Sequence, residues 1–164
     1  MADLFDLLRS SDELKRVYAQ ARIEELIENG EITRDGVREL VKLLGSRDEE
    51  LADWAWEMVY RLLRRGILTP DDVEEVKRHL FELMESKNCG VRLGAWFVAI
   101  NLLRRGVLTP DDVKERKRHL FELLESENGY VRERAWFVAI NLFEHGVLAP
   151  DDVKERKRHL FELL

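Results

Sequence analysis

The sequence is poor in several residue types, and each shortage excludes something. Its 164 residues include a single cysteine, Cys89, so no internal disulfide can form. Only one glutamine, Gln20, stands among the many Glu, Lys and Arg, a bias typical of heat-loving organisms. The longest stretch without a charged residue, Leu93 to Leu103, is too short to cross a bilayer. The first residues lack the basic and apolar segments of a signal peptide. We therefore expect a cytoplasmic protein with no membrane partner.

Positive charge is also in short supply. The net charge is −6, and residues 1–60 carry 15 Asp and Glu against 8 Lys and Arg, whereas the remainder of the chain is nearly neutral. Proteins that bind nucleic acid usually carry a basic face. The charge balance therefore makes nucleic acid an unlikely partner.

An internal repeat is the main positive signal. Residues 66–73 read GILTPDDV, residues 106–113 read GVLTPDDV, and residues 146–153 read GVLAPDDV, a step of 40 residues each time. All three prolines of the chain lie in this motif. A fixed period of this length is typical of stacked helical arrays, which bind partners along an extended surface.

Each copy of the repeat reads as two helices, here called the A helix and the B helix. In the A helix that starts near Thr69, this residue can cap the free amides, Pro70 suits the first helical turn, and the two Asp residues that follow favour the helix dipole. The B helix of the same copy runs from Val91 and should end at Gly106, where a left-handed backbone favours glycine.

The repeat extends towards the N-terminus. Residues 4–10, LFDLLRS, match residues 80–86 at an offset of 76, and residues 33–44 stand for a shortened A helix. We expect about nine helices in a single domain, residues 1–164. Its units are residues 2–30, 31–66, 67–106 and 107–146, followed by a lone final helix in residues 147–164.

The start of the B helix resembles a known family. Val91-Arg92-x-x-Ala95 and Val131-Arg132-x-x-Ala135 are similar to the HEAT-repeat pattern, whereas residues 51–55 lack its arginine. The resemblance covers nearly the whole chain. It implies an all-α fold, a right-handed α-α superhelix (solenoid) of about four stacked helical pairs whose B helices line the concave surface. It implies no particular function, since HEAT arrays include scaffolds, transport factors, regulatory subunits and a few enzymes.

The B helices carry two candidate features. Trp56, Trp96 and Trp136 recur at one position, beside the apolar stripe, and we interpret them as packing residues between units. A polar strip on each B helix contains two aromatic residues, which are natural interface anchors unless the curvature of the array buries them. The predicted partner-binding residues are Arg61, Phe97, Asn101, Arg104, Phe137, Asn141 and Glu144.

Metal and catalytic sites find little support. His79, His119 and His159 each precede a Glu by three residues, but stacked units lie about 10 Å apart, so ligands from neighbouring units would not converge. We expect each His to pair with the Glu on its own helix. No P-loop, nucleophile elbow or dinucleotide fingerprint is present. We predict no catalytic residue, no metal and no cofactor.

The prediction for function is a non-catalytic protein–protein interaction scaffold that uses the surface lined by the B helices. An alternative is self-assembly, because the final A helix has an apolar face and no partner B helix in the sequence. The residues of that face are Val153, Leu160, Phe161 and Leu164. A further alternative is a HEAT-like protein that binds nucleic acid through the basic segments that begin at Lys114 and Lys154.

Overall fold

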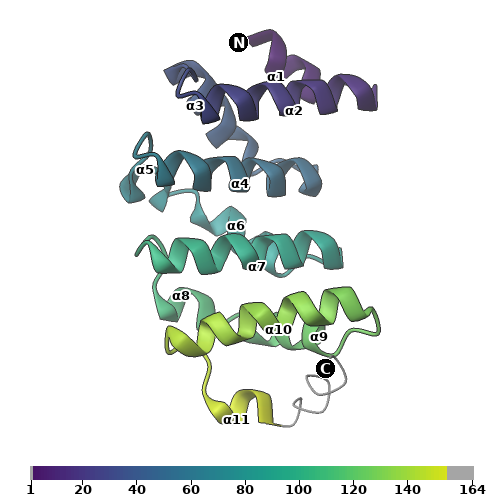
Figure 1. Ribbon diagram of the computed structural model, residues 1–164, viewed down its shortest axis with the longest axis vertical. Helices are drawn as coiled ribbons and strands as arrows, with labels where there is room; N and C mark the ends of the chain where they lie inside the picture. The colour runs from purple at the N-terminus through teal and green to yellow at the C-terminus, as the bar shows by residue number, and fades with distance from the viewer. Residues whose placement is uncertain (1, 155–164) are drawn as a thin grey trace. The chain divides into compact units, whose positions relative to one another are not determined.

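The computed structural model of the chain describes residues 2–154, and within this range the protein is helical, with no β-strand. The all-α expectation is therefore confirmed. The described part of the chain has eleven helices (Figure 1). They are α1 (Ala2–Leu8), α2 (Glu13–Glu28), α3 (Arg34–Leu43), α4 (Glu49–Arg64), α5 (Pro70–Glu74), α6 (Lys77–Met84), α7 (Cys89–Arg104), α8 (Pro110–Lys114), α9 (Lys117–Leu124), α10 (Gly129–Glu144) and α11 (Pro150–Val153).

The expectation of about nine helices was too low because two A helices are each broken into two pieces. Between α8 and α9, the Arg116 N–H donates to the Val113 carbonyl at 3.0 Å instead of to the Asp112 carbonyl. The Arg116 side chain takes that second carbonyl, through Nη1 at 2.6 Å. The helix restarts one residue later. The same tightened turn, Val76 N–H to Val73 O at 3.1 Å, separates α5 from α6. The equivalent residue there is an apolar valine, so the Arg116 side-chain bond accompanies the break and does not cause it.

The chain forms two compact units, Met1–Thr69 (the N-terminal unit) and Pro70–Leu164 (the C-terminal unit). In the N-terminal unit, α1 packs on α2, α3 packs on α4, and α2 contacts α4. In the C-terminal unit, α6 packs on α7, α9 packs on α10, and α7 contacts both α9 and α10. The long B helices α7 and α10 thus lie side by side, as Figure 1 shows in green.

The four B helices α2, α4, α7 and α10 have the same length, 16 residues. Each begins after an Asp or Asn whose side chain accepts a backbone amide; at α7, Asn88 Oδ1 accepts the N–H of Gly90 at 2.9 Å and of Val91 at 3.2 Å. Each is followed by a glycine with φ between 70° and 73°, a conformation that other residues rarely adopt. The left-handed backbone predicted at Gly106 is confirmed. These two caps fix where each B helix starts and ends.

The tryptophans of the B helices are packing residues, as predicted. Trp56 and Trp96 have no exposed surface, and Trp136 is almost fully buried. Trp96 also donates from Nε1 to the Met84 carbonyl at 3.2 Å, which ties α7 to the end of α6. Trp56 Nε1 has no hydrogen-bond partner among the described residues.

Ion pairs join neighbouring copies in the C-terminal unit. Arg92 Nη1 on α7 lies 2.6 Å from Glu122 Oε2 on α9, and Lys77 Nζ on α6 lies 3.6 Å from Asp112 Oδ2 on α8. Arg92 is nearly buried, and it belongs to the Val-Arg-x-x-Ala pattern. This arginine therefore connects one copy of the repeat to the next.

The expectation that each histidine pairs with the Glu on its own helix was wrong for His119. Its Nε2 lies 3.6 Å from Oε1 of Glu85, which follows α6, whereas Glu122 binds Arg92. The reason is that the permanently charged Arg92 is a stronger partner for Glu122 than a histidine. His159 lies outside the described residues.

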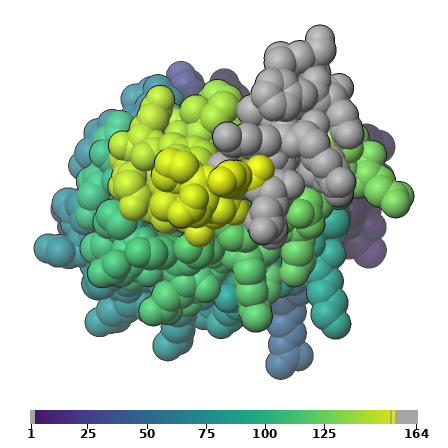
Figure 2. All heavy atoms as spheres, turned by 90° about the horizontal axis from the view of Figure 1, so that it is seen from below, coloured from purple at the N-terminus to yellow at the C-terminus, as the bar shows by residue number. Residues whose placement is uncertain are grey.

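The C-terminal unit ends, among the described residues, with α11. Figure 2 shows the segment that leads to Lys154 in yellow, outermost over the green residues of the same unit. Asp152 on α11 accepts a hydrogen bond from Lys117 of α9 at 2.8 Å, which attaches α11 to the preceding copy. Val153 is the last residue of α11, and Leu160, Phe161 and Leu164 lie outside the described residues. Self-association through these four residues stays a prediction.

We predict that Trp96→Phe destabilises the protein more than Trp56→Phe does. Both changes remove the same atoms from a fully buried site, but only the first leaves the Met84 carbonyl without its side-chain donor. An unpaired buried polar group costs about 1–3 kcal/mol. Urea unfolding followed by circular dichroism should show a difference of about 1 kcal/mol or more. Equal losses in the two variants would mean that the Trp96 hydrogen bond contributes nothing.

Candidate functional site

The C-terminal unit brings six of the seven predicted partner-binding residues onto two adjacent helices. Three lie on α7 and three on α10, at positions that differ by 40 residues. They are Phe97, Asn101, Arg104, Phe137, Asn141 and Glu144. The seventh, Arg61, is on α4 in the N-terminal unit.

Aromatic stacking connects the two helices. The rings of Phe97 and Phe137 are stacked, with centroids 5.8 Å apart and planes inclined by 18°. Phe97 is half-buried, but 53% of Phe137 is exposed. Such a pair contributes about 0.5–1.5 kcal/mol beyond its buried area. The sequence left open whether the rings would be buried by packing or exposed, and the structure shows a pair that is packed on one side and open on the other.

A hydrogen-bond network holds the second half of the same face. Arg104 Nη2 donates to Asn141 Oδ1, and Asn141 Nδ2 donates to the Phe137 carbonyl at 2.9 Å. Asn141 is buried, unlike the exposed strip residue that the sequence predicted, because its amide is enclosed by these two partners. Asn101 is half-buried, and Arg104 and Glu144 are exposed.

Three further residues belong to this surface and were missed by the sequence analysis. Arg134 lies over two rings, with Cζ 4.5 Å from the Phe97 centroid and 5.9 Å from the Tyr130 centroid. Tyr130 is 66% exposed, and Ile140, one turn beyond Phe137, is 49% exposed. We call Phe97, Tyr130, Arg134 and Phe137 the aromatic patch. The helical spacing 130, 134, 137 was the available signal, but the prediction on α10 began only at Phe137 and did not include the residues one turn before it.

The N-terminal unit uses the equivalent surface differently. Arg61 lies 3.7 Å from Glu24 and 3.6 Å from Glu28, both on α2, and its Nη2 is 3.0 Å from Glu57 Oε1 on its own helix. Trp54 Nε1 donates to Glu24 Oε1 at 3.0 Å. Arg61 therefore forms ion pairs with three carboxylates, and two of these pairs connect α4 to α2. It contributes to the packing of this unit.

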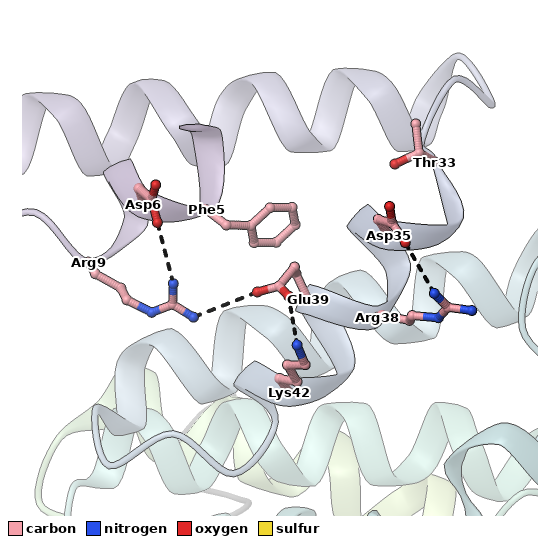
Figure 3. A pocket seen from close by; sticks show the side chains of 8 residues that line it. All are labelled: Phe5, Asp6, Arg9, Thr33, Asp35, Arg38, Glu39 and Lys42. Carbon is pink, nitrogen blue, oxygen red and sulfur yellow. Dashed lines mark hydrogen bonds and ion pairs between the residues drawn. The ribbon is translucent and has the colours of Figure 1, made fainter. Parts of the chain in front are cut away.

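A cavity of about 700 Å³ lies among α1, α3 and the residues before α3 in the N-terminal unit (Figure 3). Around the buried Phe5, every charged side chain drawn in Figure 3 has a partner of opposite charge. The hydrogen bond from Lys42, at 2.9 Å, lowers the pKa of Glu39, and Arg9 adds to this effect. A charged ligand would have to displace these ion pairs, so we do not take this cavity as the functional site.

The described part of the chain has no candidate metal site. No group of three His, Cys, Asp or Glu side chains lies close enough there to hold a metal ion. Cys89 is exposed at the start of α7, where Arg92 Nη2 approaches its Sγ at 3.7 Å.

Within residues 2–154, no helix has the length and the apolar composition that a bilayer crossing needs.

One carboxyl group on α4 is unusual. Burial, together with the smaller effect of the nearby Glu57 charge, raises the pKa of Asp53 to about 7. Asp53 Oδ1 is buried without a hydrogen-bond partner among the described residues. The residue 40 positions later is Leu93, which is buried. Asp53 therefore occupies a position where the neighbouring copy places an apolar side chain.

Comparison with known proteins supports the fold and goes no further. No protein-family model matches the chain, and no curated protein matches it. Among solved structures, the chain is similar to the crystal structure of an engineered protein from a structural genomics consortium, with a TM-score of 0.52 at 20% identity. The similarity covers 85% of this chain and 61% of the other, so this chain spans less than two thirds of that protein. At this identity the match concerns the helical fold alone.

We predict that Asp53→Asn stabilises the protein more at pH 8 than at pH 5. Because the pKa of Asp53 is raised in the folded state, the folded protein holds a proton that the unfolded chain releases above about pH 4. Stability from this group is therefore complete below about pH 4, falls as the pH rises, and is fully lost above about pH 7, so only part of the penalty is present at pH 5. The gain at pH 8 should be about 2 kcal/mol, allowing for partial solvation.

Urea unfolding of both proteins at the two pH values measures this gain. Glu50→Gln, which removes an exposed carboxylate from the same helix, is the charge-matched control. An equal effect of Asp53→Asn at pH 5 and pH 8 would contradict the prediction.

Proposed function

We propose that the chain is a HEAT-like α-solenoid that works as a non-catalytic protein-binding scaffold, and that it binds through the B-helix surface of the C-terminal unit. The observation that carries the proposal is the exposed stack of Phe97 and Phe137 across two helices. Aromatic residues that are held rigidly and remain half in solvent are typical anchors of protein interfaces.

The 40-residue repeat and the packing within each unit support the solenoid part of the proposal. In each unit a B helix contacts the next B helix, α2 with α4 and α7 with α10. Equivalent residues, such as Phe97 and Phe137, meet across that contact. Stacked helical pairs in a solenoid make this kind of contact between neighbours.

The rigidity of the surface supports the binding part of the proposal. Phe137 is held by the Phe97 ring on one side, and its carbonyl is bound by the buried Asn141. A side chain that is already ordered loses little conformational entropy when a partner covers it. Much of the side-chain entropy that a partner would otherwise have to remove from this surface is therefore already lost on folding.

We predict that Phe137→Glu leaves the protein folded but removes its partners. The ring is half-exposed already, so its loss should cost only about 1–2 kcal/mol of stability, from the stack and the buried half of the ring. A buried interface anchor, by contrast, commonly contributes about 2 kcal/mol or more to binding. Affinity capture from cells followed by quantitative mass spectrometry should show at least a tenfold loss of the specific partners.

The matched control is Val17→Glu on α2, because 54% of this side chain is exposed, nearly the same fraction as for Phe137. Partners lost equally in both variants, or kept in Phe137→Glu, would contradict the proposed site. Light scattering on the purified protein tests the alternative of self-assembly: a mass above 19.4 kDa that returns to the monomer value in Phe161→Glu would favour it.

A further inference from the structure

We infer that Arg134 determines the specificity of the aromatic patch, and that the partner is an acidic linear peptide segment with a carboxylate beside an apolar side chain. The inference rests on the proposed function and adds the chemical class of the partner. It starts from a difference among the four arginines of α7 and α10.

Three of these arginines have acceptors, and Arg134 has none among the described residues. Arg92 donates to Glu122, Arg132 donates to the Ser126 carbonyl at 2.8 Å, and Arg104 donates to Asn141. Arg134 is exposed, and its contacts are with the Phe97 and Tyr130 rings. Within residues 2–154, its N–H groups are therefore left without an acceptor.

The two rings also orient the Arg134 guanidinium. A guanidinium that lies over an aromatic face keeps its N–H donors at its edge, in the plane of the group. These donors form a fork that matches a carboxylate with two parallel hydrogen bonds. Stacking thus presents the donors and reduces the freedom that the side chain would lose on binding.

The charge around the patch favours an acidic partner. Helix α7 contains no Asp or Glu in its 16 residues. The two carboxylates of α10 are Glu133 and Glu144, and neither forms an ion pair with Arg134 within the described part of the chain. Glu144 is ten residues, about 15 Å, from Arg134 along the helix. Glu133 lies on the face of Tyr130 and Phe137, whereas Arg134 extends over Phe97 of α7, so a partner's carboxylate would reach Arg134 from the α7 side.

Apolar surface lies close to Arg134. Phe137 follows it by three residues, within one turn, and Ile140 by six, nearly two turns; about half of each side chain is exposed. Residues three apart on a helix lie about 5–6 Å apart. A partner whose apolar side chain covers Phe137 and Ile140 would thus place a neighbouring Asp or Glu within reach of Arg134.

Nucleic acid is a poorer match for this patch. A phosphate could accept from Arg134 and a base could stack on Tyr130, but strand binding depends on neutralising several phosphates. The patch offers one guanidinium without an acceptor among the described residues, which cannot neutralise several phosphates. A single charged fork beside an apolar anchor is suited to one carboxylate.

The test begins with a displayed library of random linear peptides, selected on the intact protein. Peptides enriched on the wild type should carry Asp or Glu within one or two residues of an aromatic or aliphatic side chain. The best peptide is then labelled with fluorescein, and its Kd is measured by anisotropy against the wild type, Arg134→Lys and Arg134→Glu. Arg47→Glu, an exposed arginine of the N-terminal unit, is the control with the same charge change.

We predict that Arg134→Glu raises the Kd by about tenfold or more, the effect of removing one charge-assisted hydrogen-bonded pair. Arg134→Lys should cause a smaller loss, because it keeps the charge but not the fork. Replacing the peptide carboxylate by its amide should weaken binding to the wild type by a similar factor and have little further effect in Arg134→Glu. Arg47→Glu should leave the Kd unchanged.

The failures are distinguishable. Enriched peptides that lack acidic residues, or a Kd unaffected by Arg134→Glu while Phe137→Glu abolishes binding, would overturn this inference and leave the proposed function intact. Enriched peptides that bind Phe137→Glu as well as they bind the wild type would overturn the proposed surface itself. No enrichment of any linear peptide would overturn the inference, as would a labelled oligothymidine that binds through Arg134 more tightly than the best peptide at physiological salt.

Discussion

The C-terminal unit depends on the burial of α7, a helix that is apolar on nearly every side. Ten of its 16 side chains are buried. One neighbouring helix can cover only one stripe of such a helix, so α7 needs α6, α9 and α10 around it. This requirement makes the copies of the repeat interdependent: the A helix of the same copy covers one side of α7, and the following copy supplies both helices that cover another. The aromatic stack between α7 and α10 is the exposed edge of that packing.

The fold could be read from the sequence wherever a local rule decides the outcome. The Asp and Asn caps, the glycines after the B helices and the buried tryptophans all follow from residue type and spacing. The breaks in the A helices could not be read, because they occur at Val76 and at Arg116, two residues of different chemistry, and no local rule marks this position. The pairing of His119 with Glu85 was missed for a similar reason. It depends on whether Arg92 or His119 lies closer to Glu122 once the helices have packed, and the sequence does not give these distances.

The candidate surface was predicted in part. Helical spacing placed Phe97 and Phe137 correctly on neighbouring helices, and the structure adds that their rings are stacked. The same spacing is coarse, however, since Glu133 and Arg134 both lie within about one turn of Phe137 and spacing alone does not choose between them. It also could not tell that the amide of Asn141 turns inward to Arg104. Such details follow from interhelical packing, so pattern alone overlooked Arg134.

The hydrogen bonds between neighbouring copies of the repeat have similar separations in sequence. The hydrogen bonds from Trp54 to Glu24, from Arg92 to Glu122, from Lys117 to Asp152 and from Arg104 to Asn141 join residues 30 to 37 positions apart. These bonds join adjacent copies, so none of them needs the closure of a loop longer than one repeat. A chain held together in this way can begin to fold in either unit. Its cooperativity is then set by the strength of the contacts between adjacent copies, so that weakening one of these contacts would let hydrogen exchange proceed faster in that copy than in the others.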